Sequence, residues 1–351
     1  MKAARYFGPG DIRITDIPEP PLPGRGMVKL QMLMGSVCGT DASQYRRATM
    51  VPLFQPHPVS EHSGPVVLGH EVVGTVIEKG RGVDLEIGQR VVPSSAWSCG
   101  SCPQCRAGRT SICQGYYLLG IHADGGFAEK AIYPAAMCVP VPEQCSTEAA
   151  AMAQPCGIAL HAINRASVQE YQTIAVFGIG GIGSLVLALL RARWGDGLPI
   201  IAVDIDDQRL NTAELLGATH TIHSRVYDPV VAIRELTRGY GPDVIFEATG
   251  VPAVIKQAFY CLGNGGRLVQ LGIPIYPVTL PFDEMSTREK EVLGSNGLCL
   301  GDLEQALDLL SNTDLAQRIG YHMLDLEQLV EGALMPLLNH QAGKKCLLKL
   351  Q

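Results

Sequence analysis

A strand, a glycine-rich turn, a helix, a second strand and an acidic residue follow one another between residues 174 and 204, and this succession constrains the fold most strongly. The turn has GxGGxG spacing, at Gly178, Gly180, Gly181 and Gly183. In such turns the first glycine allows the tight bend, the second lets backbone approach a pyrophosphate, and the last lets helix and strand pack closely. Free N–H groups at the helix N-terminus bind anions. The pattern predicts a dinucleotide-binding unit, with a purely structural glycine turn as the alternative.

Asp204 ends the second strand and selects the dinucleotide. Its carboxylate can accept hydrogen bonds from both hydroxyls of an adenosine ribose and would repel a 2′-phosphate. We therefore expect NAD(H) rather than NADP(H). Arg209, five residues further on, weakens this preference slightly, because an arginine can stack on adenine or reach a phosphate.

The rest of the chain predicts an α/β protein with a doubly wound parallel sheet and a second, mostly β domain. A length of 351 residues suggests two domains. Short β-type runs fill the first 150 residues, and apolar strands alternate with helical patterns from about residue 172 to 292. Helices are expected from residue 302 and over 324–340, before a final strand near 345–350. The expected boundaries are 1–153, 154–295 and 296–351, the last segment returning to the first domain.

Charge and the N-terminus exclude several classes of partner. The net charge is −6 and the pI is near 5.9, so no basic surface is expected for nucleic acid or anionic lipid. The start, MKAARYFGP, lacks the apolar stretch of a secretory signal, so we expect a cytoplasmic protein with its cysteines reduced. The apolar run at 173–190 approaches membrane-spanning length, but its glycines and flanking arginines favour a strand followed by a helix.

Four cysteines lie in CGSCPQCRAGRTSIC, at Cys99, Cys102, Cys105 and Cys113. Short loops between thiolates let four sulfurs converge on one Zn²⁺ without leaving a position for substrate, so the spacing predicts a structural zinc. An iron–sulfur cluster and free buried thiols are the alternatives.

Cys38 in VCGTD and His70 in LGHE, taken alone, are unremarkable. Together with the VVGTV that follows His70, the four-cysteine loop and the glycine turn, in this order, they resemble the zinc-dependent medium-chain alcohol dehydrogenases over essentially the whole chain. The stretch HPVSEHSGPVVLGHE is most similar to the butanediol and sorbitol (polyol) dehydrogenase branch. The resemblance implies a GroES-like catalytic domain beside a Rossmann domain, and a second, catalytic zinc.

The resemblance also implies roles for individual residues. Cys38 and His70 would ligate the catalytic zinc with Glu71 beside it, Asp41 would orient His70, and Thr40 would take the substrate proton. The dinucleotide would be held by the following residues: Gly178, Gly180, Gly181, Ile182, Gly183, Asp204, Arg209, Gly272 and Lys345.

Two positions depart from the family pattern. Where the polyol branch commonly has a zinc-binding glutamate, this chain has Gln154, whose neutral carbonyl oxygen would leave the site near +1 and strengthen its Lewis acidity. Cys156 is the rival ligand if the segment is extended, because alternate side chains then share a face; Glu71 is a third candidate. Ser43 stands where a histidine often ends the proton relay, so protons would leave through water, His57 or the cofactor ribose.

The predicted function is NAD(H)-dependent oxidation of a secondary alcohol, polyol or vicinal diol to the ketone. Alternatives are a dehydrogenase or carbonyl reductase of a cyclitol, amino-alcohol or natural-product intermediate, and a nucleotide-binding protein without catalysis. We expect two zinc ions per chain and a dimer pairing residues 293–298, or a tetramer. Candidate substrate contacts come from segments near the motifs: Tyr45, Phe54, His57, Trp97, Leu119 and Ile273.

Overall fold

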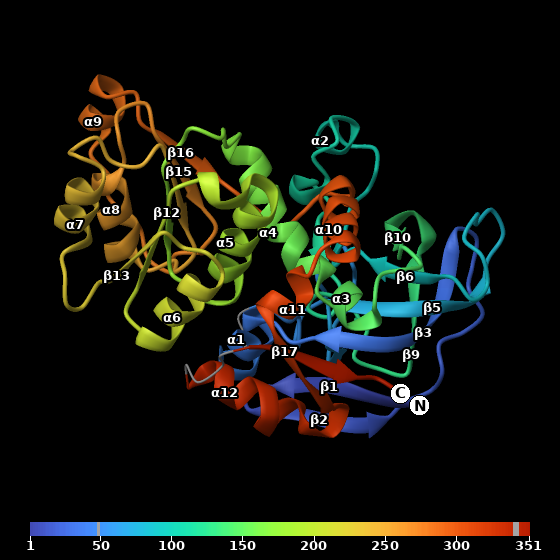
Figure 1. The fold of residues 1–351 in the computed structure, drawn as a ribbon. Coiled ribbons are helices and arrows are strands. Elements are labelled where there is room, and N and C mark those ends of the chain that lie inside the picture. Colours follow the sequence, from blue (N-terminus) through green and yellow to red (C-terminus); the bar gives the residue numbers. More distant parts are fainter. Residues whose placement is uncertain (48–49, 340–343) are drawn as a thin grey trace. The chain divides into compact units, whose positions relative to one another are not determined.

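The computed structural model describes residues 1–47, 50–339 and 344–351 (Figure 1). These residues form two compact units, the first comprising Met1–Gly157 and Leu298–Gln351 and the second Ile158–Gly297. The expected boundaries after residues 153 and 295 stay a prediction of functional domains.

The first unit is mostly antiparallel sheet, as the Gly- and Pro-punctuated runs predicted. A three-stranded sheet has the order β2(Asp11–Asp16), β1(Lys2–Gly8), β4(Val66–Val67). The seven-stranded sheet runs β10(Cys138–Pro140), β6(Arg90–Pro93), β5(Val72–Lys79), β3(Met27–Ser36), β18(Lys345–Lys349), β17(Tyr321–Asp325), with β9(Lys130–Pro134) also on β3. A short ribbon pairs β7(Ala96–Trp97) with β8(Tyr117–Leu118). The final strand therefore joins a sheet built from the start of the chain.

Helices of the first unit connect and cover these strands. They are α1(Gly39–Arg47), α2(Pro103–Arg106), α3(Thr147–Ala151), α10(Leu300–Asn312), α11(Leu315–Ile319) and α12(Met335–Leu338). The single helix expected over 324–340 is wrong. Residues up to Asp325 belong to β17, a 3₁₀ turn and a π-helical segment at Leu329–Leu334 follow, and only Met335–Leu338 is α-helical. Pro336 cannot donate to the carbonyl four residues earlier, which disfavours a continuous α-helix. Residue 340 lies outside the described residues.

The second unit is a parallel sheet with helices on both faces. Its strand order is β13(His220–His223), β12(Ile200–Asp204), β11(Ile174–Phe177), β14(Val244–Glu247), β15(Arg267–Gln270), β16(Glu291–Gly294). Helices α5(Gly181–Trp194) and α6(Asp207–Leu215) pack together on one face, and α7(Pro229–Leu236) and α8(Pro252–Cys261) on the other (Figure 1). Helix α4(Ala153–Ala166) leads into this unit and α9(Phe282–Thr287) precedes β16. Strands β11, β12 and β14 are entirely buried, which explains why they read as unbroken apolar runs.

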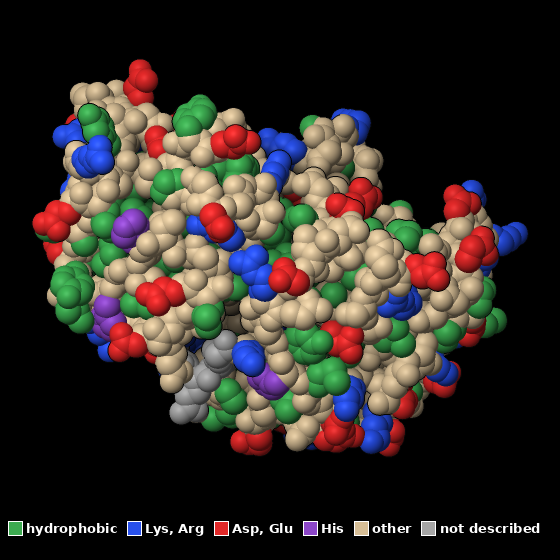
Figure 2. Space-filling view, in the orientation of Figure 1, with side chains coloured by type: hydrophobic (Ala, Val, Ile, Leu, Met, Phe, Trp, Pro, Cys, Tyr) green, Lys and Arg blue, Asp and Glu red, His purple; other side chains and the backbone are tan. Residues whose placement is uncertain are grey.

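Surface charge agrees with the composition. On the face shown in Figure 2, acidic and basic side chains are interspersed and no large patch of one sign is visible. Among the described helices, none has both the length and the apolar character that crossing a bilayer requires.

Candidate active site

Cys38 and His70 meet because two neighbouring strands end beside each other. Strand β3 pairs antiparallel with β5, with Gly35 opposite Val72, and the Ser36 N–H donates to the Glu71 carbonyl at 2.8 Å. Cys38 lies just after β3 and His70 just before β5. The ligand atoms of Cys38, His70 and Glu71 consequently lie within 4.8 Å of one another.

Asp41 connects the thiol loop to the imidazole. From the first turn of α1, its Oδ2 accepts the Cys38 N–H at 2.9 Å, and its Oδ1 lies 3.6 Å from His70 Nδ1, an electrostatic contact longer than a hydrogen bond. Burial lowers the pKa of His70, but the Asp41 carboxylate and the Cys38 thiolate outweigh it and raise that pKa to about 10. Surroundings that favour a positive charge on the ring also favour a metal cation in place of the proton, so these residues fit a zinc ion.

Glu71 is paired with Lys345. The Lys345 Nζ lies 2.7 Å from Glu71 Oε2 and donates to the Val37 carbonyl at 3.1 Å. Burial opposes the charged carboxylate, yet Lys345 and His70 bring the pKa of Glu71 below its ordinary value. Glu71 is therefore an anion already neutralised by a neighbour. The expected contact between Lys345 and a pyrophosphate stays a prediction, because here its ammonium group serves Glu71.

Gln154 presents the chemistry expected of a neutral metal ligand. Its side chain is buried, its Nε2 donates to Ser95 Oγ at 2.8 Å, and none of the described residues gives its buried Oε1 a hydrogen-bond partner. A buried acceptor without a partner is unfavourable unless a cation or donor completes it. Such an orphaned oxygen fits a zinc ligand.

Contacts connect the surroundings of Gln154 to strands β3 and β5 and to the loop before His70. Helix α3, immediately before it, packs on β3 and β5, the strands that lead to Cys38 and His70. The Leu119 N–H donates to the Ser95 carbonyl at 2.9 Å, and at the next residue the position of a Cβ on Gly120 lies 2.7 Å from Gly69 backbone, directly before His70. Ser95, and with it Gln154, is thus linked by contacts to the His70 loop.

The premise for Cys156 as a ligand is wrong. Gln154 and Cys156 lie on helix α4, where residues two apart point to nearly opposite sides, not on an extended segment. Among the described residues the Cys156 thiol is not grouped with Cys38 and His70, although it lies within electrostatic range of Lys345 and Glu71; burial raises its pKa to about 12.

Thr40 lies beside the thiol, and Ser43 lies at the surface. Thr40 Oγ1 is 3.6 Å from Cys38 Sγ. Ser43, one helical turn further along α1, is exposed. The two hydroxyls share a helix face that leads from Cys38 outward.

The four thiols of the cysteine loop converge on one point. Their Sγ atoms lie 3.5 Å apart for Cys99 and Cys113, 3.9 Å for Cys102 and Cys113, and 4.0 Å for Cys99 and Cys105. Tetrahedral zinc with bonds of about 2.3 Å places sulfurs about 3.8 Å apart. Backbone N–H groups of Ser101 and Cys102 lower the pKa of Cys99 to about 6, which favours the thiolate. The cluster fits one ion, whereas an iron–sulfur cluster needs room for several irons between its sulfurs.

Each glycine of the turn has a distinct environment. Gly178 has φ +87°, and a Cβ there would lie 2.5 Å from Thr249 Cγ2; at Gly183 it would lie 1.9 Å from the Gly178 carbonyl oxygen. Gly180 and Gly181, at the start of α5, have no atom of the described residues within 4 Å of a Cβ position. The turn therefore combines two positions where only glycine fits with an open helix N-terminus, beside which Ile182 is half-buried.

Asp204 lies at the carboxyl end of β12, beside the glycine turn. Its Oδ2 accepts the Ile179 N–H at 2.7 Å and its Oδ1 accepts the Ile205 N–H at 2.7 Å. Arg209 lies 3.9 Å from Oδ2. The Asp206 N–H also donates to Oδ1, at 3.2 Å, so the buried carboxylate braces the turn, and its contact with a ribose stays a prediction.

Glu247 ends strand β14, and Gly272 lies two residues after the neighbouring strand β15. A Cβ at Gly272 would lie 2.0 Å from the Gly250 nitrogen, so its glycine is explained by close backbone packing, and a cofactor contact stays a prediction. Glu247, buried at the end of β14, accepts the N–H groups of Thr249 and Gly250 at 2.9 and 3.0 Å. Sequence reasoning missed Glu247, although an acid ending a parallel strand was the signal that singled out Asp204.

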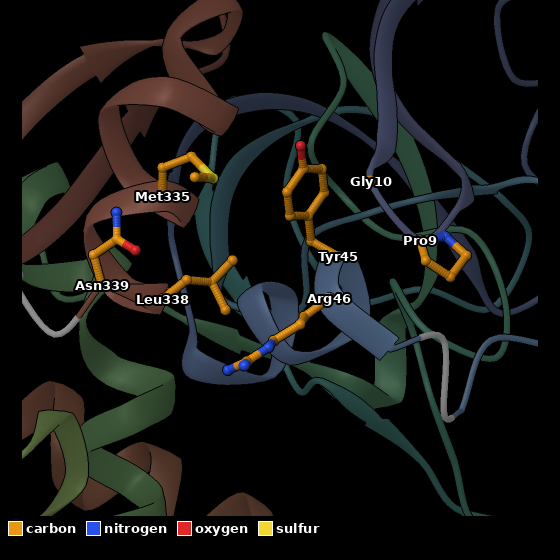
Figure 3. A pocket seen from close by; sticks show the side chains of 7 residues that line it. All are labelled: Pro9, Gly10, Tyr45, Arg46, Met335, Leu338 and Asn339. Atoms are coloured by element: carbon orange, nitrogen blue, oxygen red, sulfur yellow. The ribbon is translucent and has the colours of Figure 1, made fainter.

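The expected substrate contacts separate into different places. Trp97 stacks on Tyr117 at 5.8 Å and His57 stacks on His122 at 4.5 Å, while Leu119 is buried nearby. Phe54 and Ile273 are 94% and 83% exposed. Tyr45 instead lines a hollow of about 510 Å³ with six other residues, none of them a candidate ligand (Figure 3): Pro9, Gly10, Arg46, Met335, Leu338 and Asn339.

Comparison with known proteins shows the class. Residues 24–143 match the alcohol dehydrogenase GroES-like domain and residues 181–312 the zinc-binding dehydrogenase domain. The chain is 33% identical to (R,R)-butanediol dehydrogenase of Bacillus subtilis, over 85% of this chain and 84% of that protein. It is 31% identical to sorbitol dehydrogenase of Halalkalibacterium halodurans, over 87% and 86%.

Two solved structures extend the likeness. The crystal structure of 2R,3R-butanediol dehydrogenase from Bacillus subtilis has a TM-score of 0.90 at 30% identity, covering 99% of both chains. An alcohol dehydrogenase from E. coli CFT073, complexed with NADH, has a TM-score of 0.87 at 27% identity, again covering 99% of both.

The chain belongs to the zinc-binding alcohol dehydrogenase family. It is a zinc-binding oxidoreductase. The resemblance drawn from the motifs, and the fold class drawn with it, are confirmed.

Proposed function

We propose that this protein oxidises a vicinal diol or polyol at a secondary hydroxyl, with NAD⁺ as hydride acceptor, to give the ketone. The observation that carries the proposal is the convergence of Cys38 and His70 beside the Thr40 hydroxyl. The relatives named butanediol and sorbitol dehydrogenase support this substrate class.

The chain's own residues have separable tasks. Cys38, His70 and Gln154 would hold the catalytic zinc, and Asp41 would keep the His70 ring in place. Bound zinc supplies Lewis acidity that acidifies an alcohol, and NAD⁺ supplies the hydride acceptor. Thr40 Oγ1 would take the substrate proton and pass it along the exposed face of α1 toward Ser43 and water.

NAD(H) is the proposed dinucleotide. Asp204 would accept hydrogen bonds from the ribose hydroxyls, while its charge would oppose a 2′-phosphate. The open backbone at Gly180 and Gly181 supports a pyrophosphate at the start of α5.

The edge of the parallel sheet and the cysteines support the proposed assembly and location. Strand β16 is an edge of the described sheet, which supports a homodimer pairing residues 293–298, or a tetramer. The reducing cytoplasm is the proposed location, because the four thiols that lie close enough to hold one ion must stay reduced to bind it. A small-molecule alcohol or ketone is the proposed partner, without nucleic acid or membrane.

A ring-shaped substrate, such as a cyclitol, is the second candidate. The stacked pairs Trp97–Tyr117 and His57–His122 offer flat faces on which the C–H side of a ring can pack. The β7 strand that carries Trp97 directly follows Ser95, the partner of Gln154.

The test is a panel of diols, linear polyols, cyclitols and amino-alcohols with NAD⁺, and of ketones with NADH, followed by NADH absorbance with and without a chelator. We expect turnover of diols or polyols and about two zinc ions per chain. Cys38→Ser should abolish turnover. Cys138→Ser is the matched control, because this buried thiol contacts the Pro134 carbonyl, which a serine can also do.

Two results would contradict the proposal. Wild-type rates in the Cys38→Ser variant would exclude a catalytic zinc there. One zinc per chain, with cofactor binding but no turnover of any panel member, would indicate a nucleotide-binding protein instead.

A further inference from the structure

The amide of Gln154 has two ends of similar shape and opposite chemistry. Its carbonyl oxygen accepts, and its NH₂ group only donates, so only the oxygen can face a cation. A rotation of the amide plane by half a turn exchanges them. A glutamine therefore makes a dependable metal ligand only if a neighbour holds the NH₂ end.

Ser95 is that neighbour. Its Oγ accepts from Gln154 Nε2 at 2.8 Å, and the two side chains belong to residues that are 5% and 3% exposed. The opposite end of the amide, Oε1, is buried and has no hydrogen-bond partner in the part of the chain that the structure describes. The NH₂ end of the amide thus has its hydrogen-bond partner, and the carbonyl end is the one that can bind a cation.

The backbone of Ser95 is itself well held. Its carbonyl accepts the Leu119 N–H at 2.9 Å, next to the ribbon of β7 and β8. The adjacent Ser94 is equally buried, but its Oγ hydrogen-bonds, among the described residues, to the Ala96 backbone alone, at 3.5 Å. Two neighbouring serines therefore differ in whether the hydroxyl reaches Gln154.

We infer that Ser95 is a positioning residue, which accepts the Gln154 NH₂ group and so turns the carbonyl oxygen toward the catalytic zinc. This inference rests on the proposed role of Gln154 as a ligand. A chain with glutamate at this position has two equivalent oxygens and does not need such a partner. We therefore expect Ser95 to matter for metal binding when residue 154 is glutamine and not when it is glutamate.

The test measures metal affinity rather than turnover. The catalytic site of the otherwise intact protein is emptied and titrated with Co²⁺ and Zn²⁺ against a competing chelator, and the visible spectrum of bound Co²⁺ is recorded. Ser95→Ala should weaken affinity about 10- to 100-fold and change the Co²⁺ spectrum. Ser95→Thr should restore both. Ser94→Ala is the control and should match the wild type.

The Gln154→Glu background separates positioning from general structure. There, Ser95→Ala should change affinity by less than about twofold, because either carboxylate oxygen can bind. An equal loss in both backgrounds would overturn the inference, as would wild-type affinity in Ser95→Ala. Retention of zinc by the four-thiol site reports folding. If the Ser95→Ala variant folds poorly, Ser95→Cys replaces it in the test. Cysteine is similar in size to serine but a weak acceptor, so this variant should give an intermediate loss of metal affinity.

Failure of the underlying assignment looks different. If Gln154→Ala binds Co²⁺ with wild-type affinity and spectrum, Gln154 is not a ligand and the proposed zinc set falls. If Gln154→Ala weakens binding while Ser95→Ala does not, only the role of Ser95 is refuted.

Discussion

The same methyl group added at two glycines of one turn should have opposite consequences. At Gly183 a Cβ would lie 1.9 Å from the Gly178 carbonyl oxygen, whereas such contacts are not shorter than 3.0 Å, so α5 must move about 1 Å from β11. Overpacking of this kind costs about 1–3 kcal/mol or more. At Gly180 no atom of residues 1–47, 50–339 or 344–351 lies within 4 Å of a Cβ position and φ is −80°, so alanine should change the free energy of unfolding by less than about 1 kcal/mol.

For the affinity of cofactor binding, we expect the alanine at position 180 to have the larger effect. The Gly180→Ala methyl group would occupy the open space at the start of α5 and keep the pyrophosphate from the backbone N–H groups. Losing one hydrogen bond to a charged group costs about 1.5–3 kcal/mol, or roughly 10- to 150-fold in Kd. Urea unfolding without cofactor and NADH titration by fluorescence measure the two effects. Wild-type stability in Gly183→Ala would refute the packing role, and wild-type NADH affinity in Gly180→Ala would refute the placement of the pyrophosphate.

Three further predictions follow from other parts of the molecule. Cys105→Ser should lower zinc content from about two ions to one per chain and reduce Tm, because the loop loses its metal crosslink; unchanged metal content by elemental analysis would exclude the structural site. Asp204→Ala should reduce the ratio of kcat/KM for NAD⁺ to kcat/KM for NADP⁺. An unchanged ratio would contradict the assignment of Asp204 as the contact to the adenosine ribose. The hydrogen bond from Lys290 lowers the pKa of Glu284, so this pair stabilises the fold above the ordinary carboxyl pKa and loses that contribution as pH falls. Glu284→Gln should therefore cost about 1 kcal/mol at pH 7 and progressively less as the pH falls below the ordinary carboxyl pKa; a constant difference in urea unfolding would contradict this.

Features that depend on neighbouring residues could be predicted from the sequence. The glycine turn, the strands and helices around it and the four-thiol loop are all set by short spacings, since the interacting groups are close along the chain. Asp204 belongs with them, because one helix separates its strand from the turn. The structure explains each glycine by a contact or an open space within this short segment.

Features that depend on packing between distant segments could not be predicted in this way. The family resemblance named Cys38 and His70, but their meeting is produced by the register of β3 against β5. The pairing of Gln154 with Ser95, 59 residues apart, left no periodicity or motif.

The sequence by itself thus determined the class, the cofactors and the local motifs of this protein, because those follow from chemistry carried by short stretches of chain. Only the tertiary structure decided which end of the Gln154 amide is held, that Lys345 neutralises Glu71, and that the expected helix at 324–340 is broken. Each of these results from steric fit and electrostatics between segments that only folding brings together.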